Sequence, residues 1–276
     1  MIAPSAVSAT ESVPSEVRPW TRRIGHGWLV ETTLGVALYF TYDELRSRVS
    51  GSATVALAHG YDIVRIERAV GLYQEHRVQQ AFIGWPAFLS FWNIYYGTIH
   101  FVLPVVALVT LWRRAPARYV RWRNTLLLML TFGLLGFWLY PLMPPRLMPH
   151  RFGFVDTAAE YFNFGPQQRV VLRHGIPTAA SRAAFGNLFA AMPSLHAGWS
   201  MWSALALAPV VRRPGLRALV LLYPLVTTFA VVVTANHWIL DAICGWVALA
   251  LAWLIVVAVE HRPAPRDRRP VRAPDP

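Results

Sequence analysis

Long apolar runs, separated by short arginine-rich segments, dominate this chain of 276 residues. A helix needs about 20 mostly apolar residues to cross a bilayer, and six stretches approach that length. These stretches are 28–45, 86–112, 124–143, 194–211, 217–235 and 237–258. The pattern predicts an all-α fold, a polytopic membrane helix bundle with about six transmembrane helices. The first stretch is the weakest candidate for a transmembrane helix, because Glu31 and Asp43 lie within it.

A different periodicity follows the first stretch. Apolar residues recur every three or four positions, as on one face of a helix, at Ile63, Ile66, Val70 and Tyr73. Charged residues lie between them, at Asp62, Arg65, Glu67 and Arg68. This predicts an amphipathic helix on the membrane surface or on other helices, with its charges on the polar side.

Composition supports a membrane protein. Hydrophobic residues make up 55% of the chain and charged residues only 14%, whereas a soluble domain has about 25% charged residues. The single cysteine, Cys244, excludes an internal disulfide framework and a cysteine-rich zinc site. The net charge of +12 would suggest nucleic acid in a soluble protein. Here the arginines lie between apolar runs, so we expect no nucleic-acid partner.

Arginine counts predict the orientation, because cytoplasmic loops carry an excess of positive residues. All 26 basic residues are arginine, and with six spans 16 of them fall on one side. That side is expected to be cytoplasmic and to hold both termini, in a bacterial plasma membrane. The predicted parts are an N-terminal segment (1–27), a membrane domain (28–258) with outward segments 46–85 and 144–193, and a disordered Arg/Pro-rich tail (259–276).

This topology brings the ends of several spans to one outer level. The segments concerned are 140–146, 191–196 and 234–241. Together they supply five candidate site residues: Arg146, Ser194, His196, His237 and Asp241.

His237 and Asp241 are four residues apart, so a helix would place them on one face. A carboxylate inside a span costs about 2.5–3.5 kcal/mol, and it therefore needs a partner. When a carboxylate binds one imidazole nitrogen, it fixes the tautomer and makes the other nitrogen a better nucleophile or base. Helix packing alone would also explain such a pair, so both interpretations stay open at this point.

The other three candidates suit a phosphate. The Pro-Ser pair at 193–194 favours a helix start, whose free amides attract anions. Ser194 would donate to the phosphate, and His196 is placed to give or take a proton. Arg146 follows two prolines, and a guanidinium binds phosphate oxygens in a bidentate manner. Each residue alone also fits a plain interfacial role, but the combination at one level is more specific.

At these residues the chain resembles the type 2 phosphatidic acid phosphatase superfamily. The resemblance rests on Ala-Met-Pro-Ser-Leu-His at 191–196 together with His237 and Asp241. It is most similar to the branch of the inositol phosphorylceramide synthases, which have Pro-Ser-Leu-His where the phosphatases usually have Pro-Ser-Gly-His. Asn-His-Trp at 236–238 and Pro-Pro-Arg at 144–146 are also similar to that branch. The resemblance covers about residues 55–258.

The resemblance implies a role for each candidate. His237 would attack phosphorus and carry a covalent phospho-intermediate, with Asp241 orienting it. His196 would protonate the leaving oxygen, while Arg146 and Ser194 would hold the phosphoryl oxygens. Neither a metal nor another cofactor would be required.

Two features depart from the superfamily's phosphatases. These enzymes place a lysine before an Arg-Pro pair, whereas this chain has no lysine and Leu147 follows Arg146. They also place Ser-Arg before the catalytic histidine, where this chain has Ala-Val at 230–231. Substitute cations are expected among Arg151, Arg169, Arg173 and Arg182 of the outward loop. The loop histidines, His150 and His174, are expected to be ordinary surface residues.

These observations predict a membrane lipid phosphotransferase that moves a phosphoryl-linked headgroup through a phosphohistidine. The substrate would be a phospholipid or a polyprenyl phosphate among the membrane lipids. One alternative is a lipid phosphate or isoprenoid pyrophosphate phosphatase that uses the same residues with water. Another is a transporter in which Asp241 and the histidines form a proton or anion path. Polar residues at helix ends and the lack of an internal repeat argue against transport.

Overall fold

The computed structural model describes residues 24–48, 52–158 and 187–261. The helices are α1 (Ile24–Arg48), α2 (Ala53–Ala69), α3 (Glu75–Gln80), α4 (Pro86–Arg114), α5 (Pro116–Leu139), α9 (Leu195–Leu207), α10 (Pro214–Val233) and α11 (Ile239–Glu260). Two short 3-10 helices, η2 (Pro145–Leu147) and η3 (His150–Phe152), follow α5. The chain divides into two compact units, 1–39 and 40–276, and the helices from α2 onward belong to the second. The predicted all-α fold is confirmed for the described ranges.

Four helices of the described part are long and apolar enough to cross a membrane: α4, α5, α10 and α11. They correspond to four of the six predicted spans. The predicted stretch at 194–211 forms α9, whose 13 residues end at Leu207. At 1.5 Å per residue this helix is about 20 Å long, shorter than a hydrocarbon core of about 30 Å. The predicted length of that span is therefore wrong, and a crossing by α1 stays a prediction.

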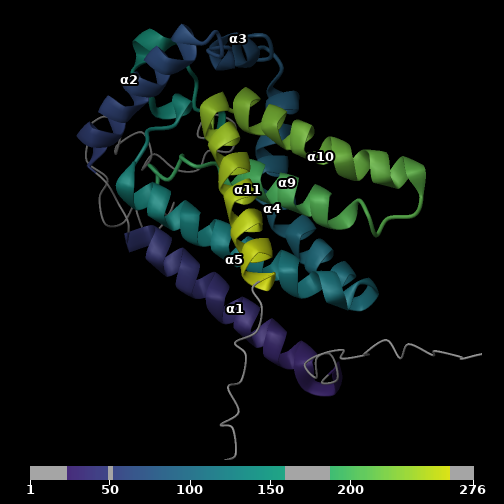
Figure 1. Cartoon of the computed structure of the whole chain (residues 1–276). Coiled ribbons are helices and arrows are strands. Elements are labelled where there is room, and N and C mark those ends of the chain that lie inside the picture. The colour runs from purple at the N-terminus through teal and green to yellow at the C-terminus, as the bar shows by residue number, and fades with distance from the viewer. Residues whose placement is uncertain (1–23, 49–51, 159–186, 262–276) are drawn as a thin grey trace, which may run out of the picture. The chain divides into compact units, whose positions relative to one another are not determined.

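Helix α9 is the centre of the second unit, because it packs against α4, α5, α10 and α11 (Figure 1). Its side chains are buried on nearly all sides, as expected of a core helix. Trp202 of α9 is fully buried, and its indole N–H donates to the carbonyl of Trp122 in α5 at 2.9 Å. This bond ties the middle of α9 to the start of α5.

Glycines let two helices approach the start of α9 closely. A Cβ added at Gly245 of α11 would lie 2.2 Å from the carbonyl oxygen of Ser194. A Cβ added at Gly136 of α5 would lie 2.4 Å from Cδ of Pro193. Both distances are far inside van der Waals contact, so only glycine permits this packing. The segment at 193–194 is therefore clamped between α5 and α11.

Gly245→Ala is expected to destabilise the protein, because the new methyl group meets backbone rather than a flexible side chain. Overpacking of this kind costs about 1–3 kcal/mol. The measurement is thermal unfolding in detergent, with Gly97→Ala as the matched control. Gly97 is also helical, but nothing lies within 4 Å of a Cβ there. Equal melting temperatures for the two variants would contradict the close contact.

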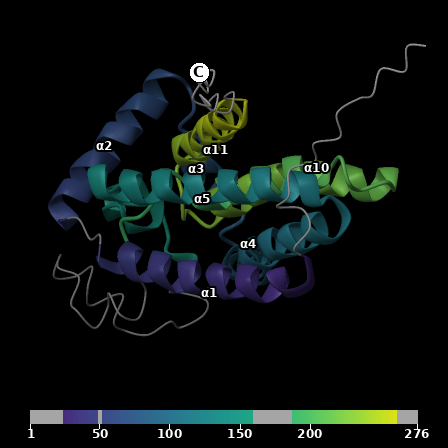
Figure 2. The same ribbon diagram turned by 60° about the horizontal axis from the view of Figure 1, so that its bottom comes forward.

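Helices α2 and α3 lie at the end of the second unit where α11 begins (Figures 1 and 2). The predicted amphipathic helix is present as α2, but α2 ends at Ala69, so Val70 and Tyr73 of the predicted pattern lie beyond it. The orientation of the helix also differs from the prediction. Ile66 and Val70 are 45% and 62% exposed, whereas Ile63 and Glu67 are buried. The prediction that Glu67 lies on the polar side is wrong, because its carboxylate reaches backbone amides at the start of α11.

Candidate active site

Backbone hydrogen bonds join the three predicted segments at one end of the helix bundle. The amide of Arg146 donates to the carbonyl of Ala235 at 2.9 Å. The amide of Ser194 donates to the carbonyl of Asp241 at 2.9 Å. The structure thus brings together the segments that carry the arginine, the serine, both histidines and the aspartate.

His237 and Asp241 are paired, but not on one helical face as predicted. Helix α11 begins at Ile239, so His237 precedes it, Trp238 is the N-cap and Asp241 lies in the first turn. Asp241 Oδ2 accepts hydrogen bonds from the Trp238 amide at 3.0 Å and from His237 Nδ1 at 3.3 Å. Because a carboxylate only accepts, the imidazole proton lies on Nδ1 and the lone pair on Nε2.

The second histidine lies beside that lone pair. His196 Nδ1 is 3.4 Å from His237 Nε2, and the tautomer above makes His196 the donor. The ring of His196 stacks on Tyr96 of α4, with centroids 4.2 Å apart and planes at 23°. Asp241, His237 and His196 therefore form one hydrogen-bonded chain, and Tyr96 fixes its outer member.

Burial keeps His237 neutral. Its side chain is 5% exposed. Burial, together with the nearby positive charge of Arg146, lowers the pKa of His237 to about 4, while the carbonyl of Ala191 opposes the shift. At neutral pH the imidazole therefore has a free lone pair, as a nucleophile requires.

Arg146 is held by an ion pair but keeps unused donors. Its Nη1 donates to Asp156 Oδ2 at 3.0 Å, and the two side chains are only 14% and 13% exposed. Its Nε is buried and has no hydrogen-bond partner within the described part of the chain. A guanidinium has five N–H donors, so several are left for an anion.

Ser194 is the N-cap of α9, and its Oγ accepts from the Ala197 amide at 3.4 Å. This bond uses the oxygen as an acceptor, so the hydroxyl proton is free for a further acceptor. The residue is fully buried, because Gly245 packs against its backbone. Helix α9 begins at Leu195, so Pro193 precedes the N-cap and does not lie in the first turn as predicted.

Two carboxyl groups that the sequence did not assign to the site hold the start of α11. Glu75 Oε1 accepts from the Ile239 amide, and Glu67 Oε1 accepts from the Leu240 amide, each at 2.8 Å. With Asp241 on the amide of Trp238, three carboxyl groups cap three successive amides directly after His237. Both glutamates are fully buried, so they fix the backbone next to the candidate nucleophile.

Glu67 is protonated at neutral pH, and its proton is shared with Glu75 through a hydrogen bond. Burial, the charge of Glu75 and this hydrogen bond together raise the pKa of Glu67 to about 9, while the Leu240 amide opposes the shift. The Oε2 atoms of both side chains have no other partner in the described ranges. A proton between these oxygens removes the repulsion that two buried carboxylates would otherwise feel.

The expected substitute cations are only partly described. Arg151 is exposed, donates to the Tyr61 hydroxyl and lies over the rings of Tyr61 and Phe152. Arg169, Arg173, Arg182 and His174 lie outside the described residues. His150 is exposed, as predicted. Where side chains are described, no group of three or more His, Cys, Asp or Glu could hold a metal ion, and metal independence stays a prediction.

Comparison with known proteins assigns the family. The model of the PAP2 superfamily matches residues 61–255, a range that contains all five predicted site residues. No curated protein and no solved structure matches the chain. Since the match covers well over half of the sequence, the chain belongs to the PAP2 superfamily, the type 2 phosphatidic acid phosphatases, whose members are phosphatases and phosphotransferases.

Proposed function

We propose that the protein is a membrane lipid phosphotransferase that carries a phosphoryl-linked headgroup on His237. The hydrogen-bonded chain from Asp241 through His237 to His196 carries the proposal. It combines a neutral nucleophile, a carboxylate that orients it and a separate acid, at the end of helices that can cross a membrane. Membership of the PAP2 superfamily supports phosphoester chemistry.

The proposed reaction has two displacements at phosphorus. In the first, His237 Nε2 forms a bond to phosphorus, the bond to the leaving oxygen breaks, and His196 gives that oxygen a proton. In the second, the acceptor hydroxyl attacks phosphorus, His196 takes its proton, and the bond to Nε2 breaks. Arg146 and Ser194 hold the phosphoryl oxygens, whose negative charge grows in each transition state.

The contact between the two histidines describes a resting site. Nε2 of His237 and Nδ1 of His196 are 3.4 Å apart, so a phosphorus with its oxygens cannot fit between them. In-line displacement places the leaving oxygen on the far side of phosphorus from the nucleophile. In the proposed reaction the substrate therefore displaces the His196 ring from Nε2.

The absence of the Ser-Arg pair from α10 favours transfer of a phosphodiester over hydrolysis of a phosphate monoester. At the positions where the superfamily's phosphatases carry Ser-Arg, this chain has Ala230 and Val231, both fully buried in α10. A phosphodiester carries one negative charge and a phosphate monoester up to two, so fewer cations suffice for the diester. The Leu195-containing motif, similar to that of the inositol phosphorylceramide synthases, supports the same choice.

We place the site at the outer face of a bacterial plasma membrane. Arg121, near the start of α5, pairs with Glu260 at the end of α11 at 2.7 Å. This pair lies at the opposite end of α11 from Asp241. The arginine-dense segments 113–123 and 212–217 connect helix ends on that opposite side, which the positive-inside rule makes cytoplasmic.

The fate of a labelled phosphate tests the proposal. Wild-type protein in vesicles containing phosphate-labelled phospholipids is expected to move the label into a new lipid, and His237→Ala is expected to abolish this transfer. His261→Ala serves as the matched control, because this exposed histidine lies at the far end of α11. If the label is released as inorganic phosphate instead, the reaction is hydrolysis rather than transfer. Unchanged turnover in His237→Ala would overturn the role of this residue.

The pKa of His237 predicts the acidic limit of the reaction. Because the folded pKa is about 4, the nucleophile is expected to stay active well below the ordinary histidine value of 6.5. Stability changes over the same pH range, because the unfolded chain takes up this proton near pH 6.5 and the folded chain does not. The stability that His237 contributes is therefore lost as pH falls from about 6.5 to about 4. Titration of ¹⁵N-labelled His237, which faces Arg146, Asp241 and His196, measures the value directly. A midpoint near 6.5 would contradict the prediction.

A further inference from the structure

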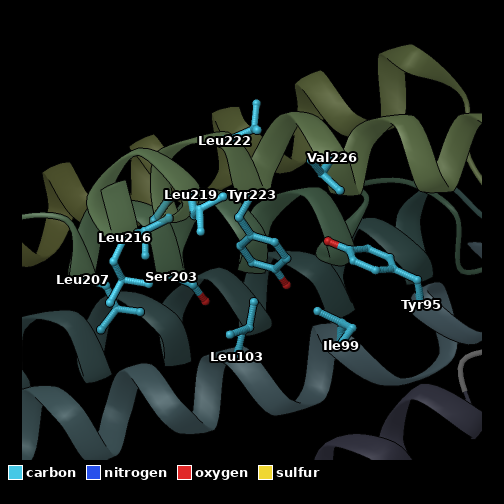
Figure 3. A pocket seen from close by; sticks show the side chains of 12 residues that line it. Tyr95, Ile99, Leu103, Ser203, Leu207, Leu216, Leu219, Leu222, Tyr223 and Val226 are labelled. Carbon is cyan, nitrogen blue, oxygen red and sulfur yellow. The ribbon is translucent and has the colours of Figure 1, made fainter. Parts of the chain in front are cut away.

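An apolar groove of about 290 Å³ runs between α4, α9 and α10 (Figure 3). Its walls consist almost wholly of hydrocarbon side chains, including Leu103, Leu207, Leu219 and Val226. Both α4 and α10 are long and apolar enough to cross a membrane, so the groove lies at hydrocarbon depth. An apolar cavity of about 150 Å³ accepts a benzene-sized ligand, so this groove has room for a stretch of alkyl chain.

Two hydroxyl oxygens in this groove, Ser203 Oγ and Tyr223 Oη, are buried and make no hydrogen bond of ordinary length and angle within the described part of the chain. The two residues are 1% and 8% exposed. Figure 3 shows both oxygens pointing into the groove. Thr227, one turn further along α10, lies close to the Tyr223 hydroxyl, but its bond of 3.0 Å is to the hydroxyl of Tyr95. A buried hydroxyl without a partner costs free energy, so these two indicate a ligand with a polar acceptor.

The groove begins beside the proposed active site. Tyr95 lines it, and the next residue, Tyr96, stacks on His196. Along α9, Ser203 follows His196 by seven residues, or about 10 Å at 1.5 Å per residue. The groove therefore extends from the level of the histidines into the membrane, as the hydrophobic part of a lipid would.

We propose that this groove binds an acyl chain of the lipid whose phosphate reaches His237, and that Ser203 and Tyr223 donate hydrogen bonds to an acyl carbonyl of that lipid. The inference rests on the proposed function, which supplies the phosphate end of the same molecule. Both hydroxyls can donate, and the first carbonyl of an acyl lipid lies a few bonds below its phosphate. A polyprenyl chain has no polar atom beyond the phosphate, so it would leave both hydroxyls unpaired. The substrate class is therefore an acylated phospholipid rather than a polyprenyl phosphate.

Photo-crosslinking in phosphatidylcholine vesicles tests this inference without catalysis. Two probes are used: a diacyl phospholipid and a polyprenyl phosphate, each with a diazirine in its hydrocarbon chain. Mass spectrometry is expected to find the diacyl adducts on Leu103, Leu207 and Leu219. Val226→Trp, which fills the groove, is expected to lower their yield at least tenfold, the equivalent of about two excluded methylenes. Leu225→Trp is the matched control, since Leu225 is 60% exposed and does not line the groove.

The hydroxyl groups have their own test. Ser203→Ala and Tyr223→Phe are each expected to lower the diacyl adduct yield about fivefold, the worth of one hydrogen bond, and to leave the polyprenyl yield unchanged. Equal effects on both probes would overturn the carbonyl contact. Adducts spread over exposed residues such as Leu221, or unaffected by Val226→Trp, would overturn the groove itself. His237→Ala is expected to keep the adducts, so loss of the proposed reaction alone leaves this result in place.

Discussion

Asp241→Asn is expected to lower the rate of phosphoryl transfer about a thousandfold, within the range of 10²–10⁴ typical of lost acid–base assistance. The asparagine oxygen still accepts from the Trp238 amide, so the start of α11 stays capped. The same oxygen also accepts from His237 Nδ1, so the imidazole keeps its tautomer. What is lost is the negative charge that stabilises the positive imidazole formed when Nε2 attacks phosphorus in the proposed reaction.

Two measurements separate this effect from loss of structure. ¹⁵N spectra of labelled histidine should show the His237 proton still on Nδ1, and the melting temperature should change little. Asp62→Asn is the matched control, because Asp62 makes an exposed ion pair with Arg65. A rate within tenfold of wild type would show that Asp241 serves only to cap the helix.

Glu67→Ala is expected to lower both the stability of the protein and the rate of transfer, although Glu67 touches no reacting atom. The change leaves the Leu240 amide without its acceptor, which costs about 1–3 kcal/mol, and it leaves Glu75 without its shared proton. Both effects loosen the backbone directly after His237. We expect a lower melting temperature together with at least a tenfold fall in transfer rate.

Glu67→Gln distinguishes a positioning role from simple packing. The amide oxygen can accept from Leu240, and the NH₂ group can donate to Glu75, so the shared proton is no longer needed. Activity should therefore be largely restored. The activity of the wild type should fall above about pH 9, because Glu67 loses its proton there and Glu75 and Asp241 repel the new charge. The activity of the glutamine variant should show no such fall.

Stability gives a second readout with a definite sign. The folded pKa of Glu67 is raised from 4.5 to about 9, so its contribution is complete below about pH 4.5 and is lost as pH rises toward 9. The wild type should therefore lose more stability between pH 5 and pH 8 than Glu67→Gln, by at most about 1.4 kcal/mol per pH unit for this proton. Parallel pH curves for the two proteins would contradict the shared proton.

Hydropathy predicts much of the bundle, because the length and apolar character of a membrane-spanning helix can be seen in its own stretch of sequence. The stretches that became α4, α5, α10 and α11 are of this kind. The meeting of Arg146, His196 and His237 also follows from sequence, since consecutive helices that run in opposite directions bring those helix ends to one side of the bundle. Helix α9 misled the prediction because its apolar residues face other helices rather than lipid.

The capping roles of Glu67 and Glu75 could not be predicted from the sequence. Glu67 follows Ile63 by one helical turn, so its place on the buried face is visible in the spacing alone. A charged residue is nevertheless assigned to the polar side unless its partner is known. That partner is the Leu240 amide, 173 residues away, and backbone amides leave no mark in a sequence. The start of α11 after His237, which replaces the expected helical pair, depends on the same contacts.

The capping of α11 makes the electrostatic environment differ between the two neighbouring helix starts at the site. Each helix start carries about half a positive charge from its aligned peptide dipoles. At α11 that charge is balanced by Asp241 and the Glu67–Glu75 pair, whereas the first turn of α9 contains no acid. An incoming anion is therefore attracted by α9 and Arg146 on one side. On the other side the start of α11 attracts it little, because its positive dipole charge is already balanced. This asymmetry would pull a phosphoryl group toward Ser194 and turn its opposite face to His237.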